Sequence, residues 1–90
     1  MDFSDRPVWV SAVRHTGGYR VWLRFNDGAE GEIDLEPQLH GEVFEPLRDV
    51  ALFAQVRLHA EYDTIVWPNG ADLAPEFLYD EVKRAASDAA

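Results

Sequence analysis

Alternation of apolar and polar residues is clearest in residues 19–35, which predict a β-hairpin. A three-residue loop at residues 26–28 places apolar side chains on one face and mostly matched charges on the other. The expected pairs are Phe25–Ala29, Leu23–Gly31, Val21–Ile33 and Tyr19–Leu35 on the apolar face, and Arg24–Glu30, Trp22–Glu32 and Arg20–Asp34 on the charged face. A two-residue loop would set Phe25 opposite Glu30 and mix the faces, so the pattern determines the register. Gly28 suits the left-handed position that closes such a loop.

Residues 7–15 are rich in β-branched and aromatic side chains and predict a strand before this hairpin. A two-residue turn at residues 17–18 would join the strand to the hairpin. The pairs expected from that turn are Ala12 with Leu23 and Val10 with Phe25. The same register gathers three residues on the outer face of the sheet: Trp9, Val13 and Trp22. A three-residue loop would exchange the two faces, so both registers stay open.

The middle of the chain predicts a short helix over residues 50–55. Asp49 suits its N-cap, and the helix would bury Leu52 and Phe53. Just before it, Pro46 argues against a long helix, and two residues are expected to anchor this segment in the core: Phe44 and Leu47.

Residues 56–59 and 64–67 predict a second hairpin, with Leu58 opposite Ile65 and Val56 opposite Trp67. Pro75 suits the first position of a helix that runs to about residue 86. Its apolar stripe, at positions i, i+4 and i+7, consists of Leu78, Val82 and Ala85.

These elements predict an α+β fold in a single domain of residues 7–86. An antiparallel sheet made of the N-terminal strand and two hairpins is expected to pack with the short middle helix and the C-terminal helix. Residues 1–6 and 87–90 are expected to be flexible ends.

Composition favours a protein of the cytoplasm. The chain has 90 residues and no cysteine, which excludes a disulfide or a thiolate site. It has no apolar run of membrane-spanning length and no signal peptide at its N-terminus, so a membrane association is not expected. The net charge is −9, with eight acids against one base in residues 27–49. Such a surface disfavours direct binding of nucleic acid and would attract a basic partner.

Candidate chemistry gives little support for an enzyme. His15, His40 and His59 are 25 and 19 residues apart and form no metal-binding spacing motif, so neither a metal nor another cofactor is expected. Glu30, Glu32 and Asp34 alternate along one strand face opposite Arg24, Trp22 and Arg20, which indicates cross-strand pairing rather than catalysis. No serine lies in a nucleophile elbow, and the glycines form no phosphate loop.

Two surfaces are candidates for binding, and each has a structural alternative. The turn after residue 67 would present Trp67, Asn69 and Asp72 as a recognition corner, or serve only as a turn with Trp67 in the core. Trp9, Val13 and Trp22 would form an apolar cluster within a charged rim, as in protein interfaces, or be covered by the C-terminal helix.

Several motifs together resemble a family of small bacterial proteins known as domain of unknown function 2442. They are the FNDG turn at residues 25–28, Asp34-Leu35, the F-x-P-L of residues 44–47, Phe53 and, most specifically, TIVWPNGADLAPE at residues 64–76. The resemblance covers about residues 10–79 and implies an α+β domain with an antiparallel sheet. It implies no activity. Family members are often encoded beside another short protein.

We therefore expect a non-enzymatic protein-interaction domain that binds a protein partner or forms a homodimer. Its acidity, its small size and the gene arrangement of the family suggest an antitoxin-like role. The alternative is an accessory regulatory domain that binds a small ligand near Trp67 and Asp72.

Overall fold

The computed structural model describes residues 7–89; the predicted flexible residues 1–6, and residue 90, lie outside that range. Strands β1 (Val10–Gly17), β2 (Arg20–Phe25) and β3 (Glu30–Asp34) form an antiparallel sheet in the order β1-β2-β3. The hairpin of β2 and β3 has the predicted register in every pair of the ladder. At its turn the Phe25 amide donates to the Ala29 carbonyl at 2.8 Å, and Gly28 adopts a φ of +91°.

Between β3 and the second hairpin lie two 3₁₀ turns, η2 (Glu36–Gln38) and η3 (Glu45–Arg48), and the helix α1 (Val50–Phe53). The Asp49 side chain caps α1 as predicted, because its carboxylate accepts the amide of Ala51 at 3.0 Å. The helix ends two residues earlier than expected. Leu47 and Phe53 are fully buried, as predicted, whereas Phe44 and Leu52 are only partly buried where they pack against the core.

The second hairpin has the predicted register but shorter strands. In β4 (Arg57–Leu58) and β5 (Ile65–Val66), Leu58 pairs with Ile65. The two strands form a separate sheet instead of extending the first one. Its link to the larger sheet includes a hydrogen bond of 2.8 Å from the Val10 amide to the Asp63 carbonyl.

The C-terminal helix α2 (Pro75–Ala89) begins at the predicted proline and ends three residues later than expected. Its stripe faces the core, since Leu78 and Val82 are buried and Ala85 packs against them. Within residues 7–89, no helix combines the length and the apolar character that a membrane span requires.

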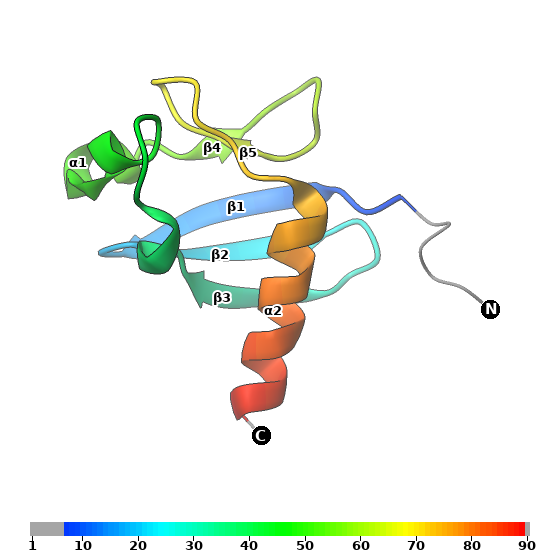
Figure 1. Ribbon diagram of the computed structural model, residues 1–90. Helices are drawn as coiled ribbons and strands as arrows, with labels where there is room; N and C mark the ends of the chain where they lie inside the picture. The colour runs from blue at the N-terminus through cyan, green and yellow to red at the C-terminus, as the bar shows by residue number, and fades with distance from the viewer. Residues whose placement is uncertain (1–6, 90) are drawn as a thin grey trace.

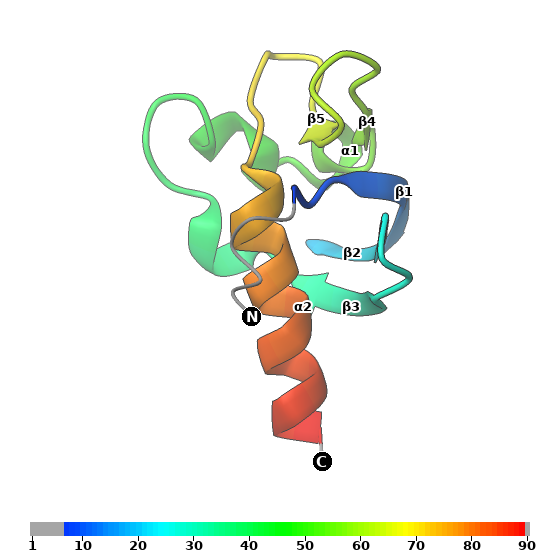
Figure 2. The same ribbon diagram turned by 90° about the vertical axis from the view of Figure 1, so that its right-hand side faces the viewer.

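The elements form an α+β arrangement in which one face of the three-stranded sheet is covered and the other is free. Helix α2 crosses the covered face, and α1 and the small β4–β5 sheet lie beside β1 at the top of the molecule (Figures 1 and 2). The buried core lies between these elements. It consists of Val10, Val21, Leu23, Phe25, Ile33, Leu35, Leu39, Leu47, Phe53, Ile65, Trp67, Ala71, Leu78 and Val82.

The absence of a side chain at Gly31 allows α2 to pack close to strand β3. Gly31 lies on the core face of β3, opposite Leu23, and a Cβ atom at this position would lie 3.1 Å from Cγ1 of Val82. A larger side chain there would push the helix away from the strand.

We therefore expect Gly31→Val to lower the free energy of unfolding by about 1–3 kcal/mol, as overpacking of a core does. Denaturant unfolding measures this change. Glu30→Val is the matched control, because it places the same side chain on the exposed face of the same strand. In a double-mutant cycle, Val82→Ala should relieve part of the Gly31→Val penalty. Additive effects of the two changes would contradict the proposed contact.

Candidate functional site

The free face of the three-stranded sheet is a polar surface formed by all three strands. No described element lies over it in either view of the molecule (Figures 1 and 2). All its charged residues are exposed, and Trp22 is half-buried among them. The outer face, as we call this surface, consists of Ala12, Arg14, Thr16, Arg20, Trp22, Arg24, Glu30, Glu32 and Asp34.

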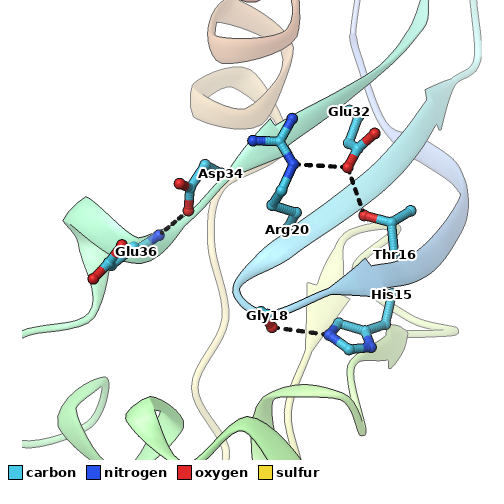
Figure 3. A network of polar contacts seen from close by, with 7 residues as sticks. All are labelled: His15, Thr16, Gly18, Arg20, Glu32, Asp34 and Glu36. Carbon is cyan, nitrogen blue, oxygen red and sulfur yellow. Dashed lines mark hydrogen bonds and ion pairs between the residues drawn. The ribbon is translucent and has the colours of Figure 1, made fainter.

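A hydrogen-bonded network joins all three strands on the outer face (Figure 3). Glu32 of β3 accepts hydrogen bonds from Nε of Arg20 in β2 and from Oγ1 of Thr16 in β1, both at 2.8 Å. These bonds, first that of Arg20 and then that of Thr16, hold the pKa of Glu32 below its ordinary value. Both charged groups are exposed and screened by solvent, so the network orients side chains more than it stabilises the fold.

Trp22 is held by a cation on the neighbouring strand. The Arg14 guanidinium lies 5.1 Å from the centre of the Trp22 ring, within the range of a cation–π contact. The two residues are paired across β1 and β2. An aromatic ring fixed beneath an arginine is an ordered contact surface, of the kind that protein interfaces use.

The predicted position of Val13 on this face is wrong. Val13 pairs with Leu23 and packs against the core, while its neighbours Ala12 and Arg14 occupy the outer face. Between Ala12 and His15 the register is the one expected from a three-residue loop, although an irregularity near Thr16 leaves only residues 18–19 in the turn, between the paired Gly17 and Arg20. A second irregularity, near Ser11, returns Val10 to its expected place opposite Phe25. The reason is the cost of burying a charge, since the two-residue turn would have directed Arg14 into the core.

Trp9 lies apart from Trp22. It is 39% exposed and sits beside Asn26, where β2 has already ended. Asn26 fixes the incoming chain: its side chain accepts the Trp9 amide at 2.9 Å and donates to the Pro7 carbonyl at 3.2 Å. The structure therefore does not bring Trp9, Val13 and Trp22 into one cluster.

The turn after β5 is built as a structural corner. Trp67 is 1% exposed and donates from its indole nitrogen to the Phe53 carbonyl at 2.9 Å, so it presents no surface to a ligand. Asn69 is exposed, but its side chain bonds the Val43 carbonyl and the Ala71 amide. Asp72 is exposed, and its backbone bridges to β5. The predicted recognition corner of Trp67, Asn69 and Asp72 is therefore not assembled as a surface.

The three histidines lie in separate surroundings. His15 bonds the Gly18 carbonyl at 2.9 Å, His59 accepts the amides of Glu61 and Tyr62, and His40 is exposed. Across residues 7–89, no group of three or more histidine and acidic side chains is placed to hold a metal ion.

Comparison with known families adds the assignment that the motifs suggested. Residues 10–84 match the family described as "Protein of unknown function (DUF2442)". The chain belongs to this family. No curated protein and no solved structure matches it. The family description names no activity, so the function of this DUF2442 domain has to be inferred from its own surface.

One polar contact of the DUF2442 domain joins elements that are distant in the sequence and was not predicted. The Tyr79 hydroxyl of α2 donates to Oδ2 of Asp27, in the turn between β2 and β3, at 2.6 Å. This bond, followed by the one from the Ala29 amide, lowers the pKa of Asp27 from its ordinary 3.8. The same bond raises the pKa of Tyr79. Phe25 packs edge-on against Tyr79, with the two ring centroids 5.1 Å apart. The aromatic residue at the start of the FNDG turn could have suggested such a pairing.

We expect Tyr79→Phe to raise the pKa of Asp27 and to lower the free energy of unfolding at neutral pH by about 1 kcal/mol. A carboxylate with a lowered pKa stabilises the fold above its unfolded-state value and loses that effect as the pH falls through its folded-state value. The difference between variant and wild type should therefore narrow below pH 3.8. Denaturant unfolding at several pH values measures it. Tyr62→Phe is the control, because Tyr62 is 64% exposed. A difference independent of pH would refute the role of the charge.

Proposed function

We propose that this DUF2442 domain is a non-enzymatic protein-interaction domain whose outer face docks a protein partner. The observation that supports the proposal most directly is an uncovered sheet face with an ordered aromatic residue at its centre. Trp22 lies between strand neighbours that carry charge, and the Arg14 guanidinium packs on its ring. Aromatic and arginine side chains are enriched at the centres of interfaces, within polar rims.

The charge distribution supports a basic partner. The net charge is −9, and residues 27–49 contain eight acidic residues and one basic residue. A partner with a positive surface would be steered towards this part of the domain, and its association would weaken as salt is added. An antitoxin-like role is consistent with this chemistry, because an acidic domain can cover a basic, nucleic-acid-facing surface of another protein. A homodimer through the outer face is the second possible assembly.

The small-ligand alternative is not favoured by a specific observation. A shallow hollow in the described part of the chain is lined by Gly41, Glu42, Glu45 and Pro46. Trp67 and Asp72, the residues expected near a ligand, do not line it.

The test is co-expression of the chain with the protein encoded beside it, followed by purification and light scattering. We expect a complex that Trp22→Thr weakens by about tenfold or more, since truncation of a central aromatic residue removes at least about 1.4 kcal/mol of binding free energy. Threonine keeps the preference for a strand, so the melting temperature should change little.

Val43→Thr is the matched control, because Val43 is 50% exposed and lies on the loop before η3, away from the outer face. A dimer of the chain alone that Trp22→Thr dissociates would assign the outer face to self-association. A monomer that forms no complex with its neighbour would refute the proposal.

A further inference from the structure

Strand β3 leaves one edge of the three-stranded sheet open. Hydrogen bonds of 2.8 Å join the Phe25 amide to the Ala29 carbonyl and the Leu35 amide to the Tyr19 carbonyl, at the two ends of the β2–β3 ladder. Bonded pairs alternate with non-bonded ones along an antiparallel ladder. The intervening acidic residues therefore direct their backbone amides and carbonyls away from β2; they are Glu30, Glu32 and Asp34. No strand within residues 7–89 pairs with this edge.

Helix α2 extends beyond the same edge. It crosses β3 at the close contact between Gly31 and Val82, and its last turns continue past the strand in both views (Figures 1 and 2). One turn beyond Val82 the helix carries only small residues on this side, the partly buried Ala85 and the exposed Ala86. A fourth strand placed beside β3 would lie under this projecting part of the helix. The helix could cover the inner side chains of such a strand as it covers those of β3.

We propose that the β3 edge binds an extended, basic segment of another protein as a fourth, antiparallel strand of the sheet. The inference rests on the proposed interaction function and adds the binding mode and the chemistry of the partner. Main-chain hydrogen bonds would supply affinity, as in other cases of strand addition. Side chains at alternate positions would supply specificity, with basic residues over the acids of β3 and apolar ones beneath α2.

Charge disfavours a second copy of this chain as the occupant. In an antiparallel pairing of two β3 edges, the hydrogen-bonded pairs would join only residues from Glu30, Glu32 and Asp34, with Gly31 and Ile33 in the non-bonded pairs between them. Like charges directly opposite one another destabilise a sheet. Of these three acids, only Glu32 forms an ion pair within the described residues, with Arg20. Oδ1 of Asp34 accepts the Glu36 amide at 2.9 Å, so the Glu30 carboxylate and Oδ2 of Asp34 can face a foreign cation. The same acids thus oppose self-pairing and select a basic strand.

The test uses a short synthetic peptide with arginine and valine at alternate positions, titrated into the ¹⁵N-labelled full chain. At saturation, amide exchange of Glu30, Glu32 and Asp34 should slow by about tenfold or more, because their free amides acquire acceptors. Exchange of Gly31 and Ile33, which already bond β2, should change much less.

N-methylation of the peptide separates strand pairing from charge attraction. In the antiparallel arrangement the arginine amides face β3 and the valine amides face solvent. Methylation of the arginine amides should therefore abolish binding, and methylation of the valine amides should leave it nearly unchanged. Equal binding of both methylated peptides would overturn the proposal and leave only a screened attraction to an acidic surface.

A pair of protein variants makes the same distinction from the other side. Glu32→Pro and Glu32→Gln both remove the carboxylate, and only proline also removes the outward amide, which bonds no strand in this protein. Glu32→Pro should bind the peptide about tenfold more weakly than Glu32→Gln, a difference of about 1.4 kcal/mol. The methylated peptides test the proposal on the unaltered chain if the proline variant does not fold.

The two proposals fail separately. If the peptide slows amide exchange at the β3 edge but the neighbouring protein forms no complex, the proposed interaction with that protein is refuted. Strand addition at the β3 edge is then still supported. A complex with that protein that Glu32→Pro and Glu32→Gln affect equally, without protection of the edge amides, would overturn the edge proposal alone.

Discussion

The pairing of β2 with β3 is the constraint on which the rest of this fold depends. Because side chains alternate along both strands, one register directs Val21, Leu23 and Ile33 into the core and their charged neighbours into water. A slip of one residue would bury the charges of the whole hairpin. The left-handed Gly28 and the carboxylate of Asp27, which accepts the Ala29 amide, hold the turn in the geometry that this register needs.

Which face of the sheet is covered is determined by the register of that hairpin and by the presence of a single long helix in the described residues. Helix α2 is the only helix of more than four residues within residues 7–89, and it packs on the apolar face, over β3. The absence of a side chain at Gly31 lets it approach closely. Since one helix covers one face, the charged face is left uncovered by the described elements. The half-buried Trp22 of that face packs against the Arg14 guanidinium.

The acidic residues of β3 have one role seen in the structure and two that belong to the proposed interaction. Glu32 orders the outer face through its bonds to Arg20 and Thr16. Along the open edge, the carboxylates oppose pairing between copies of the chain, as charged edge strands commonly do. In the proposed strand addition they would also favour a basic side chain opposite them. The edge of β3 would therefore resist pairing with a second copy of the chain and still accept a basic strand. This connects the charge of the domain with the proposed interaction.

Sequence alone determined the elements whose causes are local. Alternation and turn chemistry predicted the β2–β3 register, Asp49 predicted the cap of α1, and Pro75 with its apolar stripe predicted α2. The family motifs were also recognisable from the sequence, as the match over residues 10–84 confirms. In these cases neighbouring residues supply most of the free energy that selects the structure.

Tertiary structure decided what depends on distant partners. The two glycines of the turn allowed two registers for β1. The observed register is the one that packs Val13 against the core and leaves Arg14 in solvent. The core position of Trp67 depends on the Phe53 carbonyl, and the contact of Tyr79 with Asp27 joins residues 52 apart. Likewise, the open edge of β3 beneath α2 exists only once the helix has packed. Burial and long-range hydrogen bonds are properties of the assembled chain, so no local pattern could specify them.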